Sequence, residues 1–161
     1  ISRCSAARPK IANYPFTTLN PVLGIVELTE DRRFVMADIP GLIEGAHQGV
    51  GLGHEFLRHI ERTRILVHVL DVLPTDGSDP LTNYHTINRE LSLYSQALAD
   101  KPQVVALNKM DLDPDGVVAS SLIRRFKERN STLPYCISAV TGKGLRELNE
   151  ILWKRVRGTM E

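Results

Sequence analysis

Two acidic residues of this sequence stand directly after short apolar runs that are typical of strands. Asp111 ends the motif Asn108-Lys109-Met110-Asp111, which follows the run V-V-A-L, and Asp38 follows the run R-F-V-M-A. A carboxylate in such a place can accept hydrogen bonds from a flat heterocycle or hold a hydrated cation. These two acids are therefore the first candidates for binding chemistry.

The motif N-K-x-D predicts recognition of guanine. The carboxylate of Asp111 can accept hydrogen bonds from the N1–H and the exocyclic amine of guanine, whereas adenine has an acceptor at N1. A carboxylate that is left unpaired against adenine can reject that base by about 10⁴-fold or more. Asn108 would hold the loop and the base, and the stem of Lys109 would lie along the base plane. A capped turn is the alternative interpretation, because Asn and Asp suit turns.

The tripeptide Ser138-Ala139-Val140 supports the guanine hypothesis through its position. It follows the apolar run P-Y-C-I, where a backbone N–H could reach the same base. Tripeptides of this kind are common, so the sequence of these three residues carries little information by itself.

A second motif, Asp38-Ile39-Pro40-Gly41, predicts a phosphate and metal site. An acid at a strand end can hold Mg²⁺ through a water molecule, and a glycine three residues later lets its N–H approach a terminal phosphate. The hydroxyl of Thr18, in the stretch Phe16-Thr17-Thr18-Leu19-Asn20, can bind the same ion. By itself D-x-x-G indicates a simple turn; roughly seventy residues before N-K-x-D it favours the metal site.

The elements that must position these residues alternate between strands and helices. The pattern predicts a hairpin from 24–28 and 33–37 and further strands at 65–72, 103–107 and 134–137. It predicts helices at 51–62, at 81–98 after the cap Ser78-Asp79-Pro80, at 117–129 and after Gly144. We therefore expect an α/β fold with a mostly parallel sheet, helices on both faces, and ligands at the carboxyl ends of the strands.

Composition limits the class of protein. The chain is 42% hydrophobic with a net charge of +1, so it has no whole-chain signature for binding polyanions. Its apolar runs are too short to span a bilayer, and the first ten residues do not form a secretory signal. We expect a single domain over 1–161, a monomer, and free thiols at Cys4 and Cys136 in a reducing cytoplasm.

These residues resemble the GTP-binding proteins of the P-loop class, and in particular the GTPase domain of the Obg (CgtA) family. The stretches 14–24 and 37–63 and the motif N-K-M-D carry this resemblance, which covers nearly the whole chain. It implies a GTPase that uses Mg²⁺, binds the large ribosomal subunit through its RNA and proteins, aids subunit assembly and senses guanine nucleotides in stress. The GTP- or GDP-binding residues it implies are Phe16, Thr17, Thr18, Leu19, Asn20, Asp38, Ile39, Pro40, Gly41, Asn108, Lys109, Met110, Asp111, Ser138, Ala139 and Val140.

The glycine-rich stretch after Asp38 is then expected to be a switch segment. A γ-phosphate would order it and hydrolysis would loosen it, and the four glycines at 45, 49, 51 and 53 would keep it easy to reshape. A plain surface loop is the alternative.

Two features depart from related patterns. Leu42 stands where Ras-type enzymes carry the glutamine that orients the attacking water, so hydrolysis should be slow, with help from the backbone, a monovalent cation or the ribosome. The chain also contains no G-x-x-x-x-G-K-[ST] loop, which normally supplies most phosphate binding. We therefore expect a fragment that lacks the first strand and phosphate loop and binds GTP very weakly.

Other functions and sites compete with this interpretation. A non-hydrolytic nucleotide sensor or scaffold, a degenerate fragment that binds no nucleotide, and an ATPase of the same fold remain alternatives. His54, Glu55 and His59 form H-E-x-x-x-H, whose histidines lie off register for a zinc site. Arginines 58, 62 and 64 could contact ribosomal RNA or simply be solvated, and His68 is expected in the core.

Overall fold

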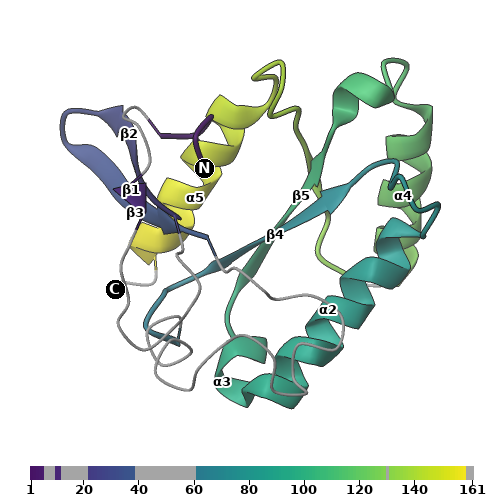
Figure 1. The fold of residues 1–161 in the computed structure, drawn as a ribbon, viewed down its shortest axis with the longest axis horizontal. Helices are drawn as coiled ribbons and strands as arrows, with labels where there is room; N and C mark the ends of the chain where they lie inside the picture. Colours follow the sequence, from purple (N-terminus) through teal and green to yellow (C-terminus); the bar gives the residue numbers. More distant parts are fainter. Residues whose placement is uncertain (6–9, 12–21, 39–60, 130, 159–161) are drawn as a thin grey trace.

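The structure is a computed structural model that describes residues 1–5, 10–11, 22–38, 61–129 and 131–158. Within these residues the strands form two three-stranded sheets, one antiparallel and one parallel (Figure 1).

The parallel sheet carries the centre of the fold. It contains β4 (Leu66–Asp71), β5 (Gln103–Asn108) and β6 (Tyr135–Cys136), in the order β4-β5-β6. The four residues from Val104 to Leu107 in the middle of β5 are all buried. A strand that is covered on both faces tolerates such an unbroken apolar run, because neither face meets water.

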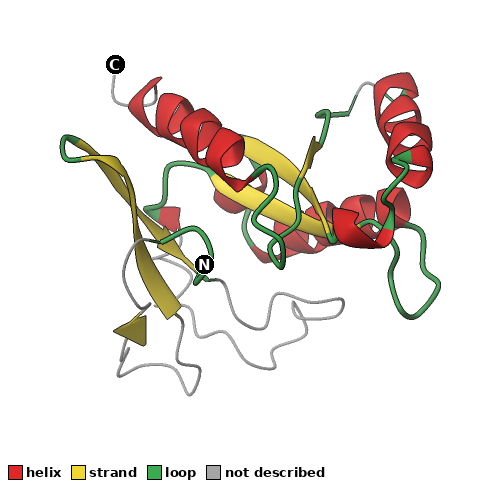
Figure 2. Ribbon diagram, turned by 90° about the horizontal axis from the view of Figure 1, so that it is seen from above, coloured by secondary structure: helices red, strands yellow, loops and turns green. Residues whose placement is uncertain are grey.

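Helices cover both faces of the parallel sheet, as the alternating pattern predicts (Figure 2). On one face, α2 (Pro80–Tyr94) and α4 (Val117–Glu128) enclose a core with Val105 and Leu107 of β5. On the other face, α5 (Leu145–Gly158) packs on Val104 and Ala106. The helices α2, α4 and α5 and strands β4 and β5 lie close to the ranges that the sequence predicts.

The predicted hairpin is confirmed and forms a sheet of its own. Strands β2 (Val22–Thr29) and β3 (Arg32–Ala37) pair antiparallel around a tight turn, and β1 (Lys10–Ile11) adds to the outer side of β2. Phe34 and Met36 pack against the α5 side of the core, and Arg32 forms a 2.8 Å ion pair with Glu150 of α5. Side-chain packing on α5, rather than strand pairing, therefore joins the hairpin to the parallel sheet within the described residues.

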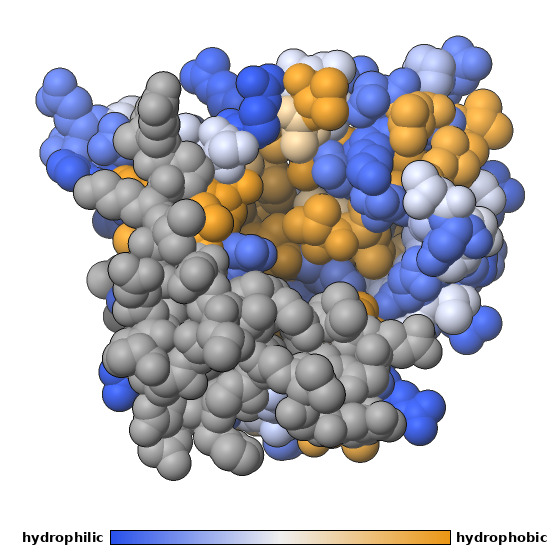
Figure 3. Space-filling view, in the orientation of Figure 1, coloured by the Kyte–Doolittle hydropathy of each residue, from blue (hydrophilic) through white to orange (hydrophobic). Residues whose placement is uncertain are grey.

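One expectation for β4 is wrong. Its apolar sequence predicts a strand that is covered on both faces, but the Val69 side chain is 55% exposed, and Val35 of β3 is 66% exposed. Apolar side chains are accordingly open on the face of the molecule that Figure 3 shows. The reason is that β3 and β4 both end the strand order of their sheets, so each has an edge with no described strand beside it.

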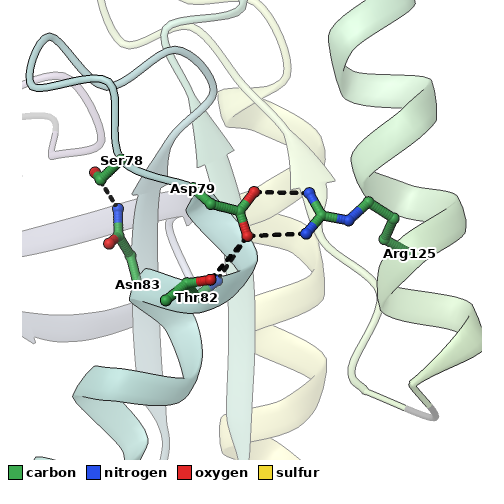
Figure 4. A network of polar contacts seen from close by, with 5 residues as sticks. All are labelled: Ser78, Asp79, Thr82, Asn83 and Arg125. Carbon is green, nitrogen blue, oxygen red and sulfur yellow. Dashed lines mark hydrogen bonds and ion pairs between the residues drawn. The ribbon is translucent and has the colours of Figure 1, made fainter.

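The predicted helix over 81–98 is interrupted once. Ser95 is extended, with φ −159°, and separates α2 from the short α3 (Gln96–Ala99), whose first turn it caps by accepting a hydrogen bond from Leu98 N–H. At the start of α2, Asp79 accepts a 3.1 Å bond from Thr82 N–H and a bidentate pair from Arg125 of α4 (Figure 4). This carboxylate thus caps one helix and binds the next.

Gly144→Ala tests the tight start of α5. Gly144 has φ +80°, and a Cβ there would lie 2.5 Å from the backbone oxygen of Cys136 in β6. The left-handed conformation and the clash together should cost about 3 kcal/mol of unfolding free energy or more, measured by urea denaturation. Gly116→Ala is the control, because Gly116 has φ +69° with nothing within 4 Å. Gly116→Ala should lower the unfolding free energy by about 1 kcal/mol. An equal or smaller loss in Gly144→Ala would show that the new Cβ causes no clash.

Arg125→Ala tests the charge pair at the start of α2. The hydrogen bonds from Arg125 are the main cause that lowers the pKa of Asp79 from 3.8 to about 2. The stability from this pair is therefore fully present above pH 3.8 and is lost as the pH falls through about 2. In the variant the pKa of Asp79 should rise toward its ordinary value, as a carboxyl NMR titration would show. If the Asp79 carboxyl of the variant titrated at the same pH as in the wild type, this prediction would be wrong. Arg124→Ala is the control, because Arg124 is an exposed neighbour of Arg125, and it should leave the pKa of Asp79 unchanged.

Candidate functional site

The predicted guanine-reading residues lie where the parallel strands end. β5 ends at Asn108, which is the register partner of Asp71 at the end of β4, and Ile137 N–H bonds to Leu107 O as β6 ends. After Asn108 the chain turns through Lys109 into the 3₁₀ helix η2 (Met110–Leu112). Because the strands run in parallel, their carboxyl ends meet at one edge, which is the usual ligand position in open α/β sheets.

Two hydrogen bonds join the loops after β5 and β6. The Ser138 hydroxyl donates to Asp111 Oδ1 at 2.7 Å, and the Ala139 N–H donates to Asn108 Oδ1 at 3.0 Å. These bonds bring the two predicted loops into direct contact through Asn108, Asp111, Ser138 and the backbone of Ala139.

The loop after β6 is held closely from inside. Ser138 is 1% exposed, and its carbonyl accepts from Gly142 N–H at 2.8 Å while its hydroxyl accepts from Thr141 N–H at 3.2 Å. On the β5 side, Met110 N–H donates to Ile137 O at 3.1 Å. These bonds give the loop a defined shape through the chain's own groups.

The polar atoms of the site are available to a ligand. The Asp111 side chain is exposed, and within the described residues only its Oδ1 receives a hydrogen bond. Asn108 uses its Oδ1 for Ala139 and has no described partner for its amide nitrogen. A carboxylate oxygen and an amide donor side by side can bind a base edge that carries both donors and an acceptor.

The Lys109 side chain has a partner that the sequence does not predict. Its Nζ forms a 2.8 Å ion pair with Asp71 Oδ2, and the contact of its stem with a base stays a prediction. Lys109 also has φ +67°, the one positive φ of a non-glycine residue in the described parts of the chain. This conformation costs about 1–2 kcal/mol, and such strain is typical of functional sites.

Three residues that the motifs do not include help to build this site. Asp71 binds Lys109, and buried Asp113 accepts from Val118 N–H and Ala119 N–H, so that it fixes the start of α4 directly after η2. Arg3 donates to the loop after β6. Asp71 could have been found from its place at the end of an apolar run, whereas the contacts of Arg3 have no sequence signal.

The predicted metal side is described at Asp38. Its carboxylate is exposed at the end of β3, and its N–H donates to Val22 O at 2.9 Å. The other residues predicted for phosphate, metal and switch roles lie outside the described residues, as do the helix over 51–60, Leu42 and the histidines of H-E-x-x-x-H; the predicted site residues concerned are Phe16, Thr17, Thr18, Leu19, Asn20, Ile39, Pro40 and Gly41.

Several other groups offer no competing site. Cys4 and Cys136 are free thiols, as predicted, and burial raises the pKa of both. His68 is only half-buried, against the expectation of a core position, because β4 is an edge strand; burial lowers its pKa. The described residues contain no cluster of three potential metal ligands, and none of their helices is long and apolar enough to cross a membrane.

Ser138→Ala tests the link between the two loops. The change removes the donor to Asp111 and the acceptor of Thr141 N–H at a buried position, so the unfolding free energy should fall by about 1–3 kcal/mol. The Thr141 amide should also exchange faster in NMR. Ser121→Ala, on the exposed side of α4, should leave both quantities unchanged. Equal stability and equal exchange in Ser138→Ala would show that the link is unimportant.

Several curated proteins of high similarity carry the name GTPase Obg. GTPase Obg of Aquifex aeolicus (strain VF5) is 56% identical over 155 residues, which cover 96% of this chain and 45% of the relative. GTPase Obg of Geobacillus kaustophilus is 58% identical over 150 residues, 92% of this chain and 34% of the relative. The resemblance to the Obg family is thus confirmed, and the chain spans less than half the length of these relatives.

Solved structures confirm the fold. The G domain of the T. maritima FeoB iron transporter matches with a TM-score of 0.64 at 16% identity, covering 99% of this chain and 88% of that one. An Era variant of Aquifex aeolicus bound to GDP·AlF₄⁻ matches with a TM-score of 0.63 at 24% identity, covering 96% and 50%. The family model described as "50S ribosome-binding GTPase" matches residues 1–109. With two thirds of its length in this match, the chain belongs to the 50S ribosome-binding GTPase family.

Proposed function

We propose that residues 1–161 form part of an Obg-type GTPase domain that binds GTP and GDP and, in the complete protein, hydrolyses GTP. The observation that supports this proposal most is the pair of hydrogen bonds from Ser138 to Asp111 and from Ala139 to Asn108. They join the two loops that the motifs assign to guanine, at the edge of the sheet where a ligand is expected.

The base would lie against the loops after β5 and β6. The carboxylate of Asp111 would accept from the N1–H and the exocyclic amine of guanine, while the Ser138 hydroxyl donates to its Oδ1 and so fixes the carboxylate plane. In the structure the Ala139 N–H donates a hydrogen bond to Asn108 Oδ1. The same N–H would also donate to the O6 of the base. Met110 and Val140 flank these groups along the chain, and the Lys109 stem would cover the base once its ion pair with Asp71 rearranges.

The metal site would be built around Asp38 and Thr18. The backbone of Asp38 is fixed by the bond from its N–H to Val22 O, and its carboxylate is exposed. This carboxylate could accept a hydrogen bond from a water bound to Mg²⁺, because Mg²⁺ usually keeps several waters and takes few protein ligands. When bound, Mg²⁺ supplies positive charge to the phosphate oxygens. Ile39, Pro40 and Gly41 would approach the γ-phosphate through their backbone, and Phe16, Thr17, Leu19 and Asn20 would border the nucleotide.

The cellular role follows from the family. Its description names ribosome binding, and the high-identity relatives are named GTPase Obg, which supports association with the large ribosomal subunit and a part in its assembly. We propose a cytoplasmic monomer. Since Leu42 cannot orient water as a glutamine does, hydrolysis would be slow until another group assists.

Asp111→Asn tests the guanine assignment. An amide at this position cannot accept from both donors of guanine, but it can donate to the 2-oxo group of xanthine. In titrations of the complete protein, GDP affinity should fall by roughly 10- to 100-fold and xanthosine diphosphate affinity should rise.

Asp115→Asn is the matched control, because Asp115 is an exposed acid four residues away and should leave both affinities unchanged. Unchanged GDP binding in Asp111→Asn would place the base elsewhere. Tighter binding of ATP than of GDP to the wild-type chain would favour an ATPase instead. For hydrolysis, phosphate release by the complete protein, with and without large ribosomal subunits, should exceed background; if it does not, the chain belongs to a non-hydrolytic sensor or scaffold.

A further inference from the structure

The first five residues form a small turn whose arginine reaches the predicted guanine-binding loop. The N–H groups of Cys4 and Ser5 both donate to Ile1 O, at 2.9 and 3.0 Å, and close this N-terminal turn. From it, Arg3 Nε donates to Ala139 O at 2.7 Å and Arg3 Nη2 donates to Val140 O at 3.2 Å. The contact joins residues 136 and 137 positions apart in the sequence.

The guanidinium adds to the internal bonds of the loop, among them the bond from Thr141 N–H to the Ser138 hydroxyl. Asn108 accepts from the Ala139 N–H, and Arg3 donates to the Ala139 carbonyl, so this residue is held at both of its peptide groups. Because a peptide is planar, fixing the carbonyls of Ala139 and Val140 also fixes the directions of the N–H groups of Val140 and Thr141. The loop can then present its N–H groups to a base in one orientation.

The choice of arginine matters for this contact. A guanidinium presents several N–H donors in a rigid plane, which can bind two successive carbonyls at once. A lysine in its place offers one compact charge at the end of a flexible stem and can satisfy one carbonyl well.

The other side of the N-terminal turn rests on the hairpin. Ile1 and Ser5 pack so closely on Gly24 of β2 that a Cβ there would lie 2.5 Å from Ile1 Cγ2 and 3.1 Å from Ser5 Cβ. Two residues before Gly24, the carbonyl of Val22 accepts from the N–H of Asp38. The N-terminal turn therefore contacts two parts of the proposed site. One is the loop Ser138-Ala139-Val140, and the other is the pair of strands β2 and β3, after which Asp38 follows.

We propose that Arg3 is a positioning residue of the nucleotide site, which orients the loop Ser138-Ala139-Val140 for the base and couples that loop to the hairpin that carries Asp38. This inference rests on the proposed guanine-binding function. Arg3 does not itself touch the base; it acts through the backbone of residues 139 and 140 and through the packing of the N-terminal turn on Gly24.

The test compares four variants of the 161-residue chain by NMR. Arg3→Ala should speed amide exchange of Val140 and Thr141 by about tenfold and weaken binding of GDP and of GMP by the same factor of about three to ten. Equal factors are expected because the loop contacts the base that both nucleotides share. Arg3→Lys should recover part of both effects. Arg124→Ala, an exposed arginine of α4, is the charge-matched control and should behave as the wild type.

Gly24→Ala tests the coupling, because Gly24 has no contact with the loop and its new Cβ would displace Ile1. It should speed exchange at the same two amides, with a thermal melt to verify that the chain remains folded. Wild-type exchange and GDP affinity in Arg3→Ala would overturn the inference while leaving the proposed function intact. Absence of GDP binding by the complete wild-type protein would reject the proposed function, and faster loop exchange in Arg3→Ala would still support the role of Arg3 in holding the loop.

Discussion

The parallel pairing of β4, β5 and β6 is the constraint on which the rest of this structure depends. Pairing in one direction brings Asp71, Asn108 and Ile137 to the same edge of the sheet, although they come from three distant parts of the chain. The buried run from Val104 to Leu107 holds β5 in register, since helices cover both of its faces. This alignment brings together the loops that the motifs assign to guanine, which are joined by two hydrogen bonds.

Much of this arrangement could be predicted from the sequence. Apolar runs with strand propensity located β4 and β5, and the helical stripes located α2, α4 and α5, because both patterns reflect which face of an element is buried. The residues Asn108, Asp111, Ser138 and Ala139 could be assigned to one site because their motifs follow neighbouring strands. The separate sheet of the hairpin could not be predicted, because an alternating pattern indicates that strands exist but does not show which strands pair.

Contacts between distant side chains and backbone were also beyond prediction. The ion pair of Lys109 with Asp71 could not be predicted, because the sequence does not show that the strands before these two residues lie side by side. Arg3 binds carbonyl groups, which every residue has, so the sequence of its partners contains no trace of the interaction. The break of the predicted helix at Ser95 shows the same limit: a local cap competed with helix propensity and prevailed.

The hydrogen bonds that join Ser138 to Asp111 and Ala139 to Asn108 are made between the chain's own residues. The conformational entropy of ordering these loops is therefore lost during folding and does not oppose association with a ligand. A pocket that is preorganised in this way can lose its nucleotide and remain in shape to take up another. For the proposed nucleotide site, such a stable shape would make exchange a matter of ligand concentration rather than of refolding.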